Sequence, residues 1–486
     1  MKKKFLFILL LLSTNGAFAA DLMEVYQQAV TSDPVYQQNV DRTLATGEGV
    51  YISLASLLPS ISGSYDPYLT SQTSSGAAAK FIGRHTARGY NMQLNATQTI
   101  FNYAQITNFM QSRVTAKQAS ATLNAAAQDL MVRVAKAYFQ VLEDVDILKA
   151  SLSTRKAFAK QLDQVNQQYK VGIKTITDVY TAQASYETSD ADYITALNTL
   201  ENDRENLRAI TGRLYPTINK LSEKFPLITP TPANINTWVD TAVKQNWQVK
   251  AAQYGAQAAK INIAQQTSGH LPTVNVQGTY GVQFTDNFGS KKIDFFDLPG
   301  IEKVKTSTAT LNFNLPIIQG GQVMALTRQA IDNYQLSLQQ LEQQLRSTLN
   351  IARQSYLNVY ADVSKISADK KAIQSSISSL QGMEEGYRVG TEILVNVLNQ
   401  QQQVFTNQKQ YAHDRYAYIN DYIALKQAAG TLNPDDLAAI NAWLRNPIHL
   451  EKEFPVKVRH LIHGSPIENE APTKVGRLNQ PAPMKQ

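Results

Sequence analysis

Cysteine is absent from the 486-residue sequence, which excludes disulfides, thiolate metal sites and a nucleophilic cysteine. It also excludes a lipid-modified cysteine at a signal-cleavage site. Long hydrophobic runs are missing as well. The apolar run from Phe5 to Leu12 is shorter than the ~20 residues that a membrane-spanning helix requires, and no later segment is long and apolar enough. We therefore expect a chain that no helix anchors in a membrane.

The apolar run instead belongs to a predicted export signal. It follows three lysines, Lys2 to Lys4, and precedes the segment Ala17-Phe18-Ala19-Ala20. A basic start, a short apolar core and small residues at the end are typical of a secretory signal peptide. We predict a signal peptide over 1–20, cleaved after Ala19 or Ala20, and an exported mature protein.

Net charge is concentrated at the ends of the chain. The formal charge is +7, of which the lysines of the signal contribute +3. The tail 445–486, with seven Lys or Arg against four Glu, contributes another +3. Only about +1 remains for the body, so we expect no nucleic-acid partner. The tail mixes Pro, Gly and Glu without periodicity, which predicts a disordered end.

Recognisable catalytic motifs are also lacking. We find no phosphate-binding glycine loop, nucleophile elbow or paired-carboxylate motif above chance level. The six histidines are scattered without ligand spacing: His85, His270, His413, His449, His460 and His463. We therefore expect neither an enzyme nor a cofactor, and no metal site beyond weak adventitious binding in the tail.

What the chain does contain is an internal duplication. The segment Tyr169-Lys170-Val171-Gly172 recurs 218 residues later as Tyr387-Arg388-Val389-Gly390. We predict two versions of one unit, 21–216 and 236–434, joined by a Pro-rich linker over 217–235.

Each unit is predicted to open with a helix, 21–57 or 236–268, which breaks at a Leu-Pro pair. Segments that alternate with period two follow, and they predict four strands of about ten residues. The predicted strands are 60–70, 89–100, 273–285 and 304–315. They form two hairpins, at about 60–100 and 273–315, with long polar loops near 71–88 and 286–303. One face of each strand is apolar and the other is polar but uncharged, which fits a membrane barrel and equally a soluble sandwich. Four strands cannot close a barrel, so the barrel interpretation requires several chains.

After each hairpin a very long helix is expected, 102–168 or 320–386. Apolar residues recur there at steps of three and four, as in coiled coils, and ~1.5 Å per residue gives roughly 100 Å. A glycine turn then leads into a second helix, 175–212 or 392–430. The remaining helix faces are rich in Gln, Ser, Asn, Thr and Ala, and either line a tunnel or are solvated.

Several of these segments carry family motifs. Asp21 to Ala29, Ala137 to Phe139, Gly269 to Thr273 and Leu315 to Gly321 resemble the TolC family of outer-membrane efflux and secretion channels, in unbroken order over 21–445. The resemblance implies an α+β membrane protein, a homotrimer in which four strands per chain form one twelve-stranded outer-membrane β-barrel. A long α-helical coiled-coil tunnel would continue the barrel through the periplasm. The linker and the segment 435–486, before its disordered tail, would form part of an equatorial belt.

The same resemblance implies an exit duct for tripartite drug-efflux or type I protein-secretion systems. Its partners would be outer-membrane lipid, a periplasmic adaptor (membrane fusion) protein and an inner-membrane transporter of the RND, ABC or MFS type. A structural coiled-coil rod or adhesin is the main alternative; it explains the signal and the heptads but not the strand hairpins. A passive diffusion porin would leave half of the chain as unexplained helix.

The resemblance also implies a gate at the periplasmic helix tips. In the family archetype, two aspartates three residues apart narrow the entrance and make it cation-selective; the matching positions here are Asn396 and Asn399. Their spacing places both on one helix face, where asparagine removes up to six negative charges from a trimer. The alternative is that they are ordinary polar surface positions.

Polar links are expected to lock this entrance. Four positions of the family lock are present: Gln167, Thr177, Asp178 and Tyr387. The arginine of the lock is replaced by Glu392, which would face Asp178 with like charge, and Lys174 or Lys170 would bridge the two. The alternative for each charged residue is a solvated helix face.

Overall fold

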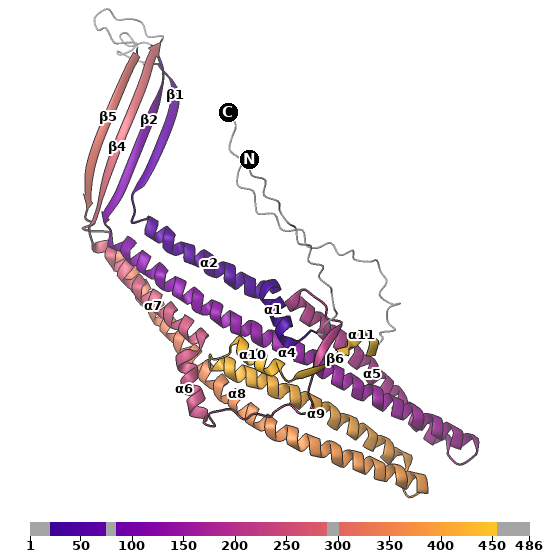
Figure 1. Cartoon of the computed structure of the whole chain (residues 1–486). Helices are drawn as coiled ribbons and strands as arrows, with labels where there is room; N and C mark the ends of the chain where they lie inside the picture. The colour runs from indigo at the N-terminus through magenta and orange to yellow at the C-terminus, as the bar shows by residue number, and fades with distance from the viewer. Residues whose placement is uncertain (1–19, 74–83, 289–300, 454–486) are drawn as a thin grey trace, which may run out of the picture.

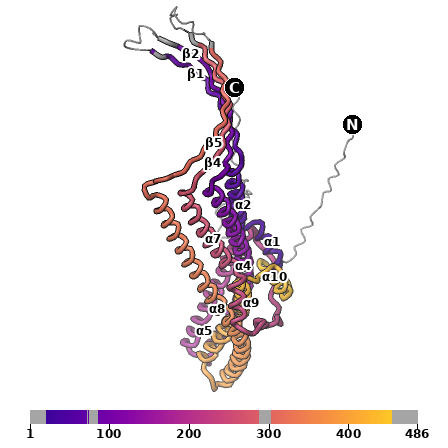
Figure 2. Tube along the Cα trace, turned by 90° about the vertical axis from the view of Figure 1, so that its left-hand side faces the viewer, coloured from indigo at the N-terminus to yellow at the C-terminus, as the bar shows by residue number. Residues whose placement is uncertain are grey.

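The computed structural model describes residues 20–73, 84–288 and 301–453. The molecule is elongated, with a sheet of long strands at one end and two helical hairpin tips at the other (Figure 1). The view turned by 90° shows the same order from sheet to tips (Figure 2). Residues 1–19 of the predicted signal peptide and the predicted tail beyond Glu453 lie outside the described residues.

The sheet consists of two hairpins that pair with each other. All neighbouring strands are antiparallel, in the order β1-β2-β4-β5. The strands are β1 Ser60–Thr73, β2 Arg84–Phe101, β4 Thr273–Phe288 and β5 Ile301–Asn314. The prediction of four strands in two hairpins is confirmed.

The expected strand length of about ten residues is wrong, because the strands contain 14 to 18 residues. Parts of the expected loops, 71–88 and 286–303, continue the sheet. The sequence there is mostly polar, so the alternation fades although backbone pairing continues, for example between Ser71 and Thr86. The rest of these loops, 74–83 and 289–300, lies outside the described chain.

The register of the sheet defines two faces, because directly opposite residues on neighbouring strands point to the same side. The face that we call the apolar face carries the large hydrophobic side chains: Ile61, Tyr65, Leu69, Tyr90, Met92, Leu94, Val282, Phe284, Leu311 and Phe313. The opposite, polar face carries mainly Ser, Thr, Asn and Gln. The strands therefore alternate as their sequences predict.

Two long helices and two shorter ones form the body. They are α4 Tyr103–Lys170, α5 Ile176–Thr211, α8 Gln322–Val389 and α9 Leu394–Ala428. Each long helix contains 68 residues, which corresponds to ~100 Å. α4 packs on α5 and α8 packs on α9, so each repeat ends in a helical hairpin (Figure 1). The predicted bounds of all four helices agree with the structure to within a few residues.

Each repeat opens with two helices, where one was expected. In the first repeat, α1 Leu22–Ser32 and α2 Pro34–Ala55 are separated by Asp33. The Asp33 carboxylate accepts the N–H of Tyr36 at 2.8 Å and thereby caps α2. Pro34, the first residue of α2, has no N–H with which to continue α1, and this explains the break.

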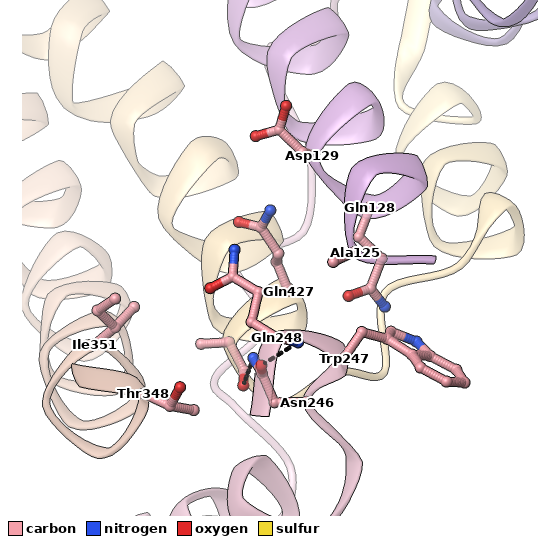
Figure 3. A pocket seen from close by; sticks show the side chains of 10 residues that line it. Ala125, Gln128, Asp129, Asn246, Trp247, Gln248, Thr348, Ile351 and Gln427 are labelled. Atoms are coloured by element: carbon pink, nitrogen blue, oxygen red, sulfur yellow. Dashed lines mark hydrogen bonds between the residues drawn. The ribbon is translucent and has the colours of Figure 1, made fainter. Parts of the chain in front are cut away.

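In the second repeat, Asn246 separates α6 Ile235–Gln245 from α7 Trp247–Thr267. Its side-chain oxygen accepts the N–H of Gln248 at 2.9 Å, and its amide donates to the carbonyl of Ala428 at 3.0 Å (Figure 3). The break therefore fastens the start of α7 to the end of α9.

The linker and the C-terminal segment meet at mid-length of the helical body. A two-stranded antiparallel sheet joins them, and short helices flank it: β3 Thr217–Leu221, α10 Pro434–Asn441, β6 Leu444–His449 and α11 Leu450–Glu453. Tyr138 of α4 is fully buried here, and its hydroxyl donates to the carbonyl of Asn219 in β3 at 2.8 Å. The small sheet thus rests directly on the long helix.

A short 3-10 turn, η1 Ser268–His270, joins α7 to β4 and places His270 at the junction of helix and sheet. Among the helices of the described ranges, none combines the length and the apolar character needed to cross a membrane.

Candidate functional site at the helix tips

The two hairpin tips are built on the same glycine turn. Gly172 follows α4 with φ +80°, and Gly390 follows α8 with φ +86°. Glycine suits this left-handed conformation because it has no Cβ to clash with the backbone. The repeated Tyr-x-Val-Gly sequence therefore marks both tips correctly.

In the first tip, Asp178 closes the start of α5. Its carboxylate accepts the N–H and the hydroxyl of Thr175 at 3.0 and 2.8 Å, and its own N–H donates to the Thr175 hydroxyl at 3.2 Å. This reciprocal capping box satisfies N–H groups that the first turn of a helix leaves without partners. The hydrogen bonds from Thr175, and to a smaller extent the Lys174 ammonium, lower the pKa of Asp178.

In the second tip, the polar residues lie along one exposed face of α9. Glu392 just precedes the helix, and its Oε2 accepts the side-chain amide of Asn396 at 2.9 Å. Asn396 and Asn399 are exposed, whereas Val397 and Leu398 between them are buried. The two asparagines therefore share a face, with the Glu392 carboxylate beside them.

Two contacts hold the hairpins together near their tips. The Lys174 ammonium of the first tip lies 4.2 Å from the centre of the Tyr387 ring, close to the end of α8. This is a cation–π contact, typically of ~0.5–1 kcal/mol at exposed sites. Further from the tip, Leu394 and Leu398 of α9 pack against apolar side chains of α4 and α5, including Phe158.

The other predicted lock residues are engaged within their own hairpin or exposed. Gln167 donates to Asp163 on α4 at 2.9 Å, and the side chain of Thr177 is exposed. Asp178 and Glu392 are each bound by a neighbour in their own tip, and no hydrogen bond joins them in the described chain. The roles of these residues in gating stay predictions.

Sequence reasoning missed the function of Thr175, although the spacing Thr175-x-x-Asp178 is itself a capping-box signature. It also missed the contact of Leu394 and Leu398 with the first hairpin. Their spacing of four residues indicates a buried helix face, but not which neighbour covers it.

A carboxyl pair lies between α4 and α5, away from the tips. Asp144 is buried and faces Asp203, and its Oδ2 has no hydrogen-bond donor in the described chain. Burial, followed by the Asp203 carboxyl, raises the pKa of Asp144 to about 8. A proton shared between the two acids satisfies both at neutral pH. The interruption of the apolar series at Val141 and Val145 by Asp144 was the available sequence signal.

The second hairpin contains two similar pairs between α8 and α9. Burial and the neighbouring Asp414 raise the pKa of Asp369 to about 6. Burial and the charge of Asp362 raise the pKa of Asp421 to about 6. Lys365 is near both and partly offsets these effects, since it donates to Asp362 at 3.1 Å.

A cavity of about 210 Å³ lies where α4, α7, α8 and α9 meet (Figure 3). Much of its polar lining is used to hold the helices: Asn246 caps α7, and Gln128 donates to the carbonyl of Leu432 at 2.9 Å. No group of three or more His, Asp or Glu side chains in the described ranges is arranged to hold a metal ion. The tips remain the stronger candidate site.

Comparison with known proteins agrees with this architecture. The profile of the family described as "Outer membrane efflux protein" matches residues 25–213 and again 238–431, once in each repeat. The chain is 34% identical to outer membrane protein TolC of Salmonella enteritidis over 462 residues, which cover 93% of this chain and 91% of that protein. It is 22% identical to the alkaline protease secretion protein AprF of Pseudomonas aeruginosa, covering 89% of each chain.

Among solved structures, the CmeC outer membrane channel of Campylobacter jejuni superposes with a TM-score of 0.71 at 16% identity, covering 87% of this chain and 89% of that one. These matches confirm the predicted family, the duplication and the combination of four strands and long helices in each chain. Proteins of this family are trimeric channels that work with efflux and secretion systems, and they transport rather than catalyse. The chain belongs to the outer membrane efflux protein family, and it is an efflux or secretion channel of the outer membrane that extends into the periplasm.

Proposed function

We propose that the chain forms the exit duct of a tripartite drug-efflux or type I protein-secretion machine. Three copies would each contribute a four-stranded sheet to one twelve-stranded barrel, and their helices to a periplasmic tunnel. The observation that carries the proposal is the position of the two kinds of hairpin. Each repeat has its strand hairpin at one end and its helical hairpin at the other, joined by a helix of 68 residues (Figure 1).

The tips would dock on a periplasmic adaptor protein and an inner-membrane transporter of the RND, ABC or MFS type, which supplies the energy. Both tips expose apolar side chains, which supports a protein partner at this end: Val171 is 70% exposed, Ile173 69%, Val389 64% and Ile393 63%. The relative AprF is a protein of alkaline protease secretion, which favours including the secretion systems.

The entrance would be narrowest at Asn396 and Asn399. Rings of neutral amides provide dipoles rather than charges, so the constriction itself would select weakly for cations. The Glu392 carboxylate, bound to Asn396, would supply the remaining negative charge at this level. The Lys174–Tyr387 contact would keep the two tips of one protomer together in the closed state.

The rest of the predicted lock would act around this contact. Asp178 would keep α5 fixed through its capping box with Thr175, while Gln167 and Thr177 would lie at the boundary with a neighbouring protomer. Such exposed polar links contribute ~0–1 kcal/mol each, so no single one would close the channel alone.

Two measurements test the duct. Mass measurement of the purified protein in mild detergent should give three times the mass of the mature chain. Deletion of the gene should increase sensitivity to drugs or remove proteins from the secretome. A clean monomer contradicts the shared barrel, and a deletion strain that is unchanged in both profiles contradicts the exit duct.

A further inference from the structure

We propose that the sheet carries a binding site for the phosphate groups of outer-leaflet lipid, formed by Lys303 and Lys305 of β5. This proposal rests on the proposed function, because it requires that the apolar face of the sheet contacts the membrane. It adds a specific site and a headgroup chemistry to that contact.

The apolar face has the height of an outer-membrane bilayer. Val274 pairs with Phe313 at one end of β4 and β5, and Phe284 pairs with Lys303 ten residues further along β4. Ten residues correspond to ~33 Å along a strand, or ~25 Å along the membrane normal at a strand tilt of ~40°. Outer-membrane barrels have an apolar band of ~25 Å, so the pair Phe284 and Lys303 marks one edge of this band, and Lys305, which pairs with Val282, lies two residues inside it.

Aromatic side chains mark the same edge. Tyr90 stacks on Phe284 with ring centroids 5.3 Å apart, and Tyr65 lies 5.5 Å from Tyr90. Tyrosine rings gather at the level of the lipid headgroups in membrane proteins. This end of the sheet points away from the helical body (Figure 1), so in the proposed orientation it lies in the outer leaflet.

Both lysines are exposed near this edge, and neither forms an ion pair with the residues that the structure describes. They are two residues apart on β5, so both lie on the apolar face, roughly 7 Å from each other. Glu302 between them points to the polar face, because side chains alternate along a strand. Asp286, the acidic residue of the apolar face in the described strands, binds Arg88 at 2.9 Å.

The opposite edge of the band is uncharged. At the helix end of the apolar face, the described strands carry apolar or neutral residues: Ile61, Ala96, Gln98, Val274, Leu311 and Phe313. A basic edge on one side only suits a membrane whose outer leaflet is built from phosphorylated glycolipid. Lysine suits such a headgroup, since its ammonium donates three hydrogen bonds and its flexible stem reaches past the apolar band.

Native mass spectrometry of the full-length trimer tests the site. The trimer is titrated with a bisphosphorylated glucosamine-disaccharide lipid and, separately, with the same lipid without phosphates. We expect the wild type to retain the phosphorylated lipid preferentially. The double substitution Lys303→Gln with Lys305→Gln removes both charges, leaves polar side chains one atom shorter, and should weaken retention about 30-fold, since each lysine near a lipid surface contributes about fivefold.

Two further variants serve as controls. Lys303→Arg with Lys305→Arg retains both charges and should bind the lipid like the wild type. Lys117→Gln removes an exposed lysine from α4, in the helical body, and should change nothing. The site is refuted if the dephosphorylated lipid binds the wild type equally well. It is also refuted if the Gln pair binds like the wild type, or if Lys117→Gln weakens binding as much.

Failure of this proposal and failure of the duct give different results. A Gln variant that forms trimers, conducts normally and still binds the phosphorylated lipid counts against the lysine site alone. A monomeric wild type counts against the shared barrel. If the Gln variant does not assemble, the wild type and the Arg variant still test the site. The proposal requires both to bind the phosphorylated lipid better than the lipid without phosphates.

Discussion

The two helix tips are copies of one turn, yet their charged positions differ. The repeat offset of 218 residues places Lys174 in the first tip at the position of Glu392 in the second, and Asp178 at the position of Asn396. The two positions are hydrogen-bonded to each other in the second tip but not in the first. Asn396 donates to Glu392 within the second tip, whereas Lys174 reaches across to the Tyr387 ring of the other hairpin.

The N-termini of α5 and α9, the second helices of the two hairpins, are also stabilised differently. α5 begins with the capping box of Thr175 and Asp178, whereas Ile393, at the start of α9, makes no side-chain capping bond. The N-terminus of α9 therefore depends more on packing, and Leu394 and Leu398 supply it against the first hairpin. The comparison indicates that the start of α5 is fastened by its own cap, while the start of α9 is fastened by packing against the first hairpin.

The largest effect should come from separating the tips. Leu394 and Leu398 are 3% and 5% exposed, and removal of such buried side chains costs ~2–5 kcal/mol each. The double substitution Leu394→Ala with Leu398→Ala should therefore free the second tip and strongly raise the resting conductance in planar bilayers.

Leu380→Ala is the matched control for this pair. Leu380 of α8 is 9% exposed and packs against Val397 and Val404 of α9, inside the second hairpin. Leu380→Ala should destabilise the second hairpin without releasing it from the first hairpin. It should therefore change the resting conductance much less than the double substitution at Leu394 and Leu398. An equal increase in conductance would show that contact between the hairpins does not hold the entrance.

Charge at the second tip should control ion selectivity. Asn396→Asp with Asn399→Asp adds six carboxylates to a trimer and should raise cation selectivity and create block by multivalent cations from the periplasmic side. Glu392→Gln should have the opposite, smaller effect on selectivity, because it removes three charges beside the amides. Reversal potentials in salt gradients measure both. Unchanged values in both variants would place these residues away from the constriction.

The carboxyl pairs predict a pH dependence of stability. The folded Asp144, with a pKa raised from 3.8 to about 8, binds its proton more tightly than the unfolded chain does. Its contribution to the free energy of unfolding is therefore fully present below pH 3.8 and is lost as the pH rises through about 8. Asp369 and Asp421, with pKa values near 6, act in the same direction over a narrower window.

Asp144→Asn isolates this contribution. At pH 8 to 9 the wild type must keep or lose the proton of a buried carboxyl, whereas the amide has no proton to lose, so the neutral variant should be more stable than the wild type by ~1–3 kcal/mol. At pH 4 the difference should shrink or reverse. Thermal unfolding followed by circular dichroism gives the comparison. A difference that does not change with pH would mean that Asp144 is not protonated in the folded chain.

A smaller effect is expected for the contact between tips. Lys174→Glu removes a cation–π contact of ~0.5–1 kcal/mol in each of three protomers and should raise the resting conductance modestly. Lys170→Glu makes the same charge change in the same tip, where Lys170 is exposed, and should have less effect. If both variants behave alike, the change reflects tip charge and not the contact with Tyr387.

The sequence predicts the elements of this fold better than their partners. Periodicity locates the long helices and the four strands, and the repeated glycine turns locate both tips. Local capping at Asp33 and Asn246 divides the opening helices. This signal is weaker than the continuous helical pattern around it, so the sequence pattern predicts one helix in each repeat. β3 and β6 are short and pair across distant parts of the chain, so no local pattern predicts them. At the tips, Asp178 turns toward Thr175 because a neighbour three residues away is nearer than any residue on the other hairpin.

The smallest predicted effect tests the comparison of the tips most directly. Ile393→Thr places in the second tip the capping residue that the first tip has at Thr175, and Ile393 is 63% exposed, so little packing is lost. A threonine at this position can accept the N–H of Asn396 and should stabilise the start of α9 by ~0.5–1 kcal/mol per protomer. Thr175→Ala should destabilise α5 by a similar amount. We expect Ile393→Thr to lower the frequency of spontaneous openings in single-channel records, because a better fastened second tip depends less on the first. Adding Asn396→Asp would complete the capping box but would also replace the amide that donates to Glu392 with a second carboxylate, so it should cancel part of this gain. If Ile393→Thr raises thermal stability and leaves the frequency of openings unchanged, the start of α9 is not the part that moves when the channel opens.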